Sequence, residues 1–147
     1  MRNITRLLTA ALVLTALFTL AACDRTLWGT ERSAVLAFSE PAVDGLFGGW
    51  TAGDYAAFSH SFDAAMQADL PAGGFAAFKQ DVDARLGTYI SRRVARVGLS
   101  DEFYVVDYQA QFAHTEPVTV TVAFHASDHS IAAMSFTMGA ESWSTFD

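Results

Sequence analysis

The stretch 103-FYVVDYQAQF-112 alternates apolar and polar side chains, and this alternation decides the fold class. Successive side chains of a strand point to opposite faces of its sheet, so a period of two indicates a strand with one buried face. The side chains on one face are Tyr104, Val106, Tyr108, Ala110 and Phe112. Asp107, Gln109 and Gln111 face the other way, so the stretch predicts a half-buried strand.

The same period recurs further along the chain. The apolar members are Val118, Val120, Val122 and Phe124 in the second stretch, and Ala132, Met134, Phe136 and Met138 in the third. A less regular strand is expected at about 88–97. The connections 98–102, 113–117 and 127–130 are short and turn-like, which predicts an antiparallel meander of four strands.

Before Gly87 the apolar period is 3.6, which predicts three short helices. The first is expected to begin at Ser39-Glu40-Pro41, the second after Asp54, and the third at Asp69-Leu70-Pro71. Their apolar stripes are Val43, Leu46, Phe47 and Trp50; Tyr55, Phe58, Phe62, Ala65 and Met66; and Phe75, Phe78, Val82 and Leu86.

The helices and the sheet each have one apolar face to cover. A sheet that is apolar on one face must bury it, and the helix stripes are the apolar surfaces on offer. We therefore predict an α+β fold, in which three short N-terminal helices pack on one face of a curved, cone-like, four-stranded antiparallel meander.

The N-terminus has the layout of an export signal, with Arg2 and Arg6 ahead of an apolar stretch at 7–20. Its end, Leu20-Ala21-Ala22-Cys23, resembles the lipobox of bacterial lipoproteins. The resemblance implies that the Cys23 thiol takes a diacylglyceryl group and that the chain is cut just before it. The alternative is an ordinary secretory signal with a chance cysteine at its end.

The expected division of the chain is a lipoprotein signal peptide at 1–22, a lipidated Cys23 and tether at 23–38, and one α+β domain at 39–147. Two or three acyl chains hold a protein at a bilayer essentially permanently. We therefore expect a protein anchored by lipid to the cell membrane and extracytoplasmic, either periplasmic or on the outer surface. Cys23 is the single cysteine, so the domain has no disulfide.

Charge narrows the range of partners. Loss of Arg2 and Arg6 with the signal leaves seven basic side chains against 16 acidic ones, a balance of −9. Nucleic acid is not an expected partner, because phosphate binding needs clustered Lys and Arg. The same acidity should keep the domain off an anionic bilayer surface and leave the anchoring to the lipid.

Turn and core residues of both halves form a pattern that covers about residues 41–138. Its parts are Gly53-Asp54-Tyr55, Phe58-Ser59, Phe62 to Met66, Leu70-Pro71, Phe75, 87-GTYIS-91 and 104-YVVDYQAQF-112. This pattern resembles the prokaryotic domain-of-unknown-function family numbered 3887, and the order of helices and strands resembles the nuclear transport factor 2-like, or cystatin-like, superfamily. The resemblance implies a secreted protein or lipoprotein whose activity is unassigned.

Catalytic residues are not carried over from that superfamily. Its isomerases and dehydratases place a carboxylate or a His–Asp pair inside the cone, whereas the apolar faces predicted here hold no acidic residue. An isomerase-like activity would require Asp54 or Asp63 to turn inward. We assign no cofactor and no metal: His125 and His129 around Asp128 are read as exposed turn residues, with a surface metal site as the alternative.

Arg92, Arg93 and Arg96 form the basic cluster of the predicted sheet. They can meet an acidic partner or pair with Asp107 across strands. The alternative is a solvated face that discourages pairing at a sheet edge.

A concave apolar face is the default place for a small ligand. We therefore predict a non-enzymatic module that binds a small apolar molecule or an envelope partner at the open end of the cone. The side chains expected at this site are Tyr55, Tyr104, Tyr108, Phe112, Phe124, Met134 and Phe136. The alternative is a homodimer or interaction module that uses the outer sheet face, with Gln109, Gln111, Thr119 and Thr121.

Overall fold

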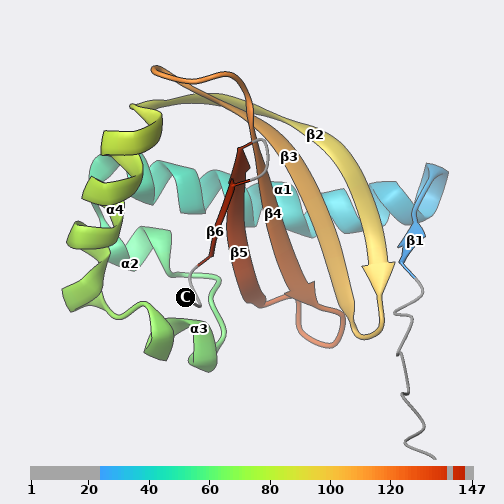
Figure 1. Cartoon of the computed structure of the whole chain (residues 1–147). Coiled ribbons are helices and arrows are strands. Elements are labelled where there is room, and N and C mark those ends of the chain that lie inside the picture. The colour runs from blue at the N-terminus through green and yellow to red at the C-terminus, as the bar shows by residue number, and fades with distance from the viewer. Residues whose placement is uncertain (1–23, 139–140, 145–147) are drawn as a thin grey trace, which may run out of the picture.

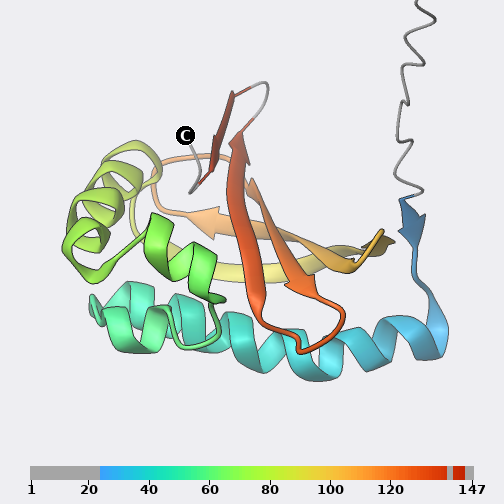
Figure 2. The same cartoon turned by 90° about the horizontal axis from the view of Figure 1, so that it is seen from below.

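A long helix, α1 (Gly29–Ala52), lies along one face of a curved antiparallel sheet in the computed structural model of the chain (Figures 1 and 2). The structure describes residues 24–138 and 141–144. The predicted α+β class is confirmed, with the helices before the main strands in the chain and the core between α1 and the sheet. We call the sheet face toward α1 the inner face.

The sheet is an open meander in which each strand pairs with the next along the chain. Its main strands are β2 (Tyr89–Ser100), β3 (Phe103–Phe112), β4 (Val118–His125), β5 (Ile131–Met138) and β6 (Glu141–Ser144). The two-residue β1 (Arg25–Thr26) pairs with the other edge of β2. The four predicted strands are present, and β1 and β6 extend the sheet beyond the prediction.

The predicted alternation sets the inner face. Along β3, Val106, Tyr108, Ala110 and Phe112 are buried, and along β4 every second residue from Val118 to Phe124 is buried. Tyr104 is half-buried because it lies near the start of β3, at the margin of the core.

The first helix begins ten residues earlier than predicted. Ser39 is buried within α1 instead of capping it, and Pro41 lies inside the helix. A proline removes the hydrogen bond to the carbonyl four residues earlier. That carbonyl belongs to Ala37, and both Ala37 and Pro41 are exposed, so water can satisfy it. Residues 25–38, which the prediction placed in a tether, are therefore part of the fold, because the sheet begins at Arg25 and Val35 is buried in the core.

The predicted second helix is divided into α2 (Tyr55–Phe58) and α3 (Ala64–Asp69). Between them Phe62 forms a β-bridge with Ile131, and the Asp63 N–H donates to the Ile131 carbonyl at 2.9 Å. This long-range pairing interrupts the helix. α4 (Ala72–Leu86) follows, and its predicted inward residues Phe75, Val82 and Leu86 are buried.

Trp50, near the end of α1, lies at the centre of an aromatic cluster. Its ring is 5.7 Å from the ring of Phe58, 6.0 Å from Phe75 and 5.6 Å from Phe78. These contacts join α1, α2 and α4 beside the sheet (Figure 1). No helix in the described part of the chain is both long and apolar enough to cross a membrane.

Candidate functional site

Five of the seven side chains predicted to bind a ligand form the core beneath α1. Tyr108, Phe112, Phe124, Met134 and Phe136 are buried and belong to one hydrophobic cluster. None of them lines any of the three pockets described below. The structure therefore brings these residues together, but α1 covers the inner face on which we expected a ligand.

Tyr55 lies away from that face. Its hydroxyl donates to the Leu70 carbonyl at 2.8 Å, and its ring is 5.7 Å from that of Phe75. These contacts connect α2 with the turn before α4, so the observed role of Tyr55 is structural.

Tyr104 lines a pocket of about 280 Å³ that we call the N-terminal pocket. The pocket lies among β1, the first turns of α1, the ends of β2 and β3 that meet at their hairpin, and the turn between β4 and β5. Its lining residues are Arg25, Leu27, Glu31, Ala34, Val35, Phe38, Leu99, Tyr104 and His129. Of the predicted ligand-binding residues, Tyr104 is the one that lines it.

Aromatic rings form one side of the N-terminal pocket. The Phe38 ring stacks on the His129 ring with centroids 3.7 Å apart and planes 3° apart. Phe38 also lies 5.8 Å from Tyr104 and 5.6 Å from Phe124. His129 has a positive φ of 62°, and its N–H donates to the His125 carbonyl at 2.9 Å, which holds the turn that places the ring.

An ion pair lies at the rim of the pocket. The two terminal nitrogens of the Arg25 guanidinium, Nη1 and Nη2, donate to the Glu31 carboxylate at 2.9 Å and 3.0 Å. The hydrogen bond and charge of Arg25 lower the pKa of Glu31, and those of Glu31 raise the pKa of Arg25. The pocket therefore combines an apolar, aromatic lining with a rim whose opposite charges balance.

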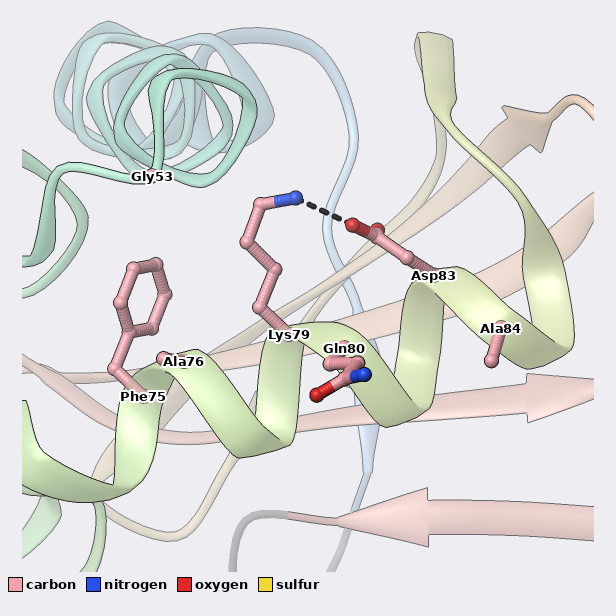
Figure 3. A pocket seen from close by; sticks show the side chains of 7 residues that line it. All are labelled: Gly53, Phe75, Ala76, Lys79, Gln80, Asp83 and Ala84. Carbon is pink, nitrogen blue, oxygen red and sulfur yellow. Dashed lines mark hydrogen bonds and ion pairs between the residues drawn. The ribbon is translucent and has the colours of Figure 1, made fainter.

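A second pocket, the α4 groove, has a volume of about 490 Å³ and lies between the end of α1 and α4 (Figure 3). Figure 3 shows the side chains of Lys79 and Asp83 directed at one another, and they form an ion pair. Asp83 also accepts from the Trp50 indole N–H at 3.3 Å. The groove is larger than the N-terminal pocket and likewise contains an ion pair, but of the predicted ligand-binding side chains none lines it.

The third pocket, of about 270 Å³, lies on the outer sheet face around Arg93, Gln109 and Gln111. The Gln109 amide donates to the Thr119 hydroxyl at 2.8 Å, and the Gln111 amide donates to the carbonyls of Phe112 and Thr115. These outer-face amide groups therefore have partners within the protein.

The arginines of the basic cluster point in different directions. Arg96 pairs with Asp107 at 2.8 Å on the outer face, as one of the two sequence interpretations predicts, and Asp107 also accepts from the Thr121 hydroxyl at 2.7 Å. The Arg92 side chain instead turns inward and is only 7% exposed. It binds Glu40 at 2.9 Å and Asp44 at 2.6 Å.

The Arg92 guanidinium carbon lies 4.7 Å from the centroid of the Tyr108 ring. The charge of Arg92 is therefore balanced by the two carboxylates of α1 and by the face of this aromatic ring. Burial acts to lower the pKa of Arg92, but the hydrogen bond and charge of Glu40 raise it overall. Sequence reasoning missed this network. The available signal was the spacing of Glu40 and Asp44, four residues apart on one helix face.

A His–Asp pair is present, although not on the inner face. His125 Nε2 lies 2.8 Å from the Asp63 carboxylate, and Asp63 caps α3 by accepting from the Met66 N–H at 2.7 Å. His125 follows the outward register of β4. Asp54 is exposed and caps α2 by accepting from the Ala57 N–H at 3.2 Å. Neither carboxylate has the inward position that an isomerase-like activity would require.

Burial acts to raise the pKa of Asp63, but the Met66 N–H and His125 together bring it below the ordinary value. The folded state therefore binds a proton at the Asp63 carboxyl group less readily than the unfolded state does. The free energy of unfolding falls as the pH drops through the carboxyl range near about 4.

The substitution Asp63→Asn keeps a side chain that can cap α3 and removes the titrating carboxyl group. We expect a shallower loss of stability on acidification, measured by urea unfolding between pH 3 and 7. An unchanged acid slope would contradict the assignment.

The residues of the possible metal site have other partners. Asp128 accepts from the Ser130 N–H and hydroxyl, His129 stacks on Phe38, and His125 pairs with Asp63. Among residues 24–138 and 141–144, no group of three or more His, Cys, Asp or Glu side chains is arranged to hold a metal ion.

No family model, no curated protein and no solved structure matches the chain. The resemblance to family 3887 therefore stays a prediction. The signal peptide and the lipidation at Cys23 lie outside the described residues.

Proposed function

We propose that the protein is a lipid-anchored, extracytoplasmic module of the cell envelope that binds a small apolar molecule in the N-terminal pocket and carries out no catalysis. The observation that carries the proposal is the lining of this pocket. The half-buried side chains of Phe38 and Tyr104 reach solvent there, whereas the other predicted ligand-binding residues of the sheet are buried beneath α1.

The size of the pocket limits the ligand. Its volume of about 280 Å³ lies just below the ~300–1,000 Å³ of typical drug-sized sites. The stacked rings of Phe38 and His129 favour a flat or chain-like apolar group. The Arg25–Glu31 pair at the rim can accommodate one polar group, so the expected ligand is a small amphiphile.

Filling the pocket tests the proposal. Ala34 is an exposed lining residue of α1, and Ala37 is an exposed residue of the same helix that does not line the pocket. We expect native mass spectrometry of the chain from Asp24 to Asp147, purified without added lipid, to show a reproducible extra mass on the monomer. Ala34→Trp should weaken ligand binding at least about tenfold, equivalent to about 1.4 kcal/mol.

Ala37→Trp adds the same bulk to the same helix outside the pocket and should keep the extra mass. If both variants bind equally well, the ligand does not occupy this pocket. A dimer without ligand would instead favour the alternative, in which the outer face around Gln109 and Thr119 binds a second copy.

A further inference from the structure

We infer that the folded domain lies directly on the membrane surface to which Cys23 is anchored, with the Trp28 side chain in the headgroup layer. The inference rests on the proposed lipid anchor at Cys23. It adds to that proposal the face of the domain that meets the bilayer and the source from which the N-terminal pocket takes its ligand.

The length of chain between the anchor and the fold carries the first step. Arg25 pairs with Leu99 in the sheet, and the Leu27 N–H donates to the Val97 carbonyl at 2.8 Å. Asp24 is therefore the single residue between Cys23 and the sheet. Even a fully extended chain spans at most about 3.6 Å per residue, so the Cα atoms of Cys23 and Trp28 are no more than about 18 Å apart.

The second step is the exposure of Trp28. This side chain is 73% exposed, although its neighbour Leu27 is buried in the core. Trp28 occupies the N-cap position of α1, and Gly29 follows in a left-handed conformation with φ of 55°, so the fold fixes where the indole emerges. Tryptophan is enriched at membrane–water interfaces, where its apolar ring and its N–H are both satisfied.

Charge at this corner permits the contact. The domain is acidic overall, but around Trp28 the negative charges of Asp24 and Glu31 are matched by the positive charges of Arg25 and Arg32. The acidic turn 101–102 joins β2 and β3 at the end of the sheet near β1. We therefore expect a zwitterionic surface to be preferred over an anionic one.

The N-terminal pocket shares this corner, because Arg25, Leu27 and Glu31 belong to its lining. Figure 1 shows β1 and the start of α1 at one end of the molecule and α2 to α4 at the other. A domain held by this end has its pocket within reach of the bilayer surface and the α4 groove away from it. The ligand class is then a membrane amphiphile.

The experiment uses the full chain, purified in its lipid-modified form and reconstituted in phosphatidylcholine vesicles that carry brominated acyl chains. Flotation of the vesicles reports anchoring, and tryptophan emission reports the position of the indole. Subtracting the spectrum of Trp28→Phe isolates Trp28 from the chain's other two tryptophans. We expect the Trp28 emission to be quenched more by bromines near the headgroup than by bromines at the chain ends.

Ile90 supplies the matched control, since it is 60% exposed and lies on the same strand as Leu99. Nine residues along the strand place it up to about 30 Å from Leu99. A tryptophan introduced by Ile90→Trp into the Trp28→Phe protein should not be quenched. Flotation without quenching of Trp28, or equal quenching at both positions, would overturn the membrane-facing orientation while the anchor stands. Failure of the full chain to float, with Cys23→Ser behaving identically, would refute the anchor and the orientation with it.

Discussion

Gly49→Ala is expected to destabilise the protein by about 3 kcal/mol or more, at the upper end of the cost of overpacking. A Cβ at this position of α1 would lie 2.7 Å from the Phe58 Cα and 2.8 Å from the Ala57 carbonyl carbon, and closer still to the Phe58 nitrogen. These are backbone atoms of α2 and have no rotamer by which to move aside.

α2 also cannot retreat easily. Phe58 is buried against Phe62, at 5.0 Å between ring centroids, and against Phe75 at 4.6 Å. The Asp54 N–H donates to the Gly49 carbonyl at 2.9 Å, which fixes α2 at this distance from α1. An added methyl group therefore separates the two helices or distorts both of them.

Gly48→Ala is the matched control. Gly48 lies one residue earlier in the same helix, it is exposed, and a Cβ there would meet no atom within 4 Å. Replacing a helical glycine by alanine then gains up to about 1 kcal/mol. Urea unfolding of the two variants should therefore show shifts of opposite sign. Equal shifts would mean that the close approach of α1 and α2 does not limit this position.

The sheet could be predicted because every second residue is buried along β4, and along β3 from Val106 to Phe112. Buried and half-buried side chains alternate without interruption in both stretches, and the turns between strands are short. The order of the strands in the sheet can therefore be predicted largely from the local sequence. The helices were predicted less well. The α1 start was missed because Pro41 and the polar residues around Thr30 favour a helix that begins later, and burial of Leu27 and Val35 outweighs that local signal.

The division between α2 and α3 has a similar cause. The bridge between Phe62 and Ile131 joins residues that are far apart in the chain, and no helical period reports it. The pairs Glu40–Arg92 and Asp63–His125 span 52 and 62 residues. Such pairs depend on how α1 and α3 are positioned on the sheet. That position cannot be read from the local pattern of a single sequence.

The predicted ligand site was predictable only in part. The inward register of Tyr108 and Phe112 was predictable from the period of β3. Whether their face is open depends on the length and path of α1, which sequence reasoning placed too late in the chain. Tyr104, at the margin of the core, reaches a pocket because the inner face is left uncovered there.

Glu40→Gln is expected to destabilise the protein by about 2–3 kcal/mol, because it leaves the Arg92 charge buried with less compensation. Glu40 is 37% exposed and Asp44 is 75% exposed, so Glu40 is the more enclosed of the two partners. Glu40 also binds Arg92 through its carbonyl oxygen, at 3.3 Å from Nη2, which brings α1 close to β2 at this point.

Asp44→Asn is the matched control, since it removes a negative charge from the same helix and the same guanidinium. Its exposure predicts a cost of at most about 1 kcal/mol. In the double variant E40Q/R92M no buried charge remains, and we expect it to be no less stable than Glu40→Gln alone. Urea unfolding of the parent protein and the three variants compares their stabilities, and equal costs for Glu40→Gln and Asp44→Asn would contradict the role assigned to burial of Arg92.

The same variant distinguishes the two possible ligand sites. Arg92 joins α1 to the inner face that contains Tyr108 and Phe112, so loss of Glu40 should loosen the helix over that face and increase binding of an apolar dye before unfolding. If the physiological ligand binds the inner face, Glu40→Gln strengthens its binding and Ala34→Trp has no effect. If the ligand binds the N-terminal pocket, Ala34→Trp removes the binding, and Glu40→Gln leaves it unchanged because Glu40 does not line that pocket.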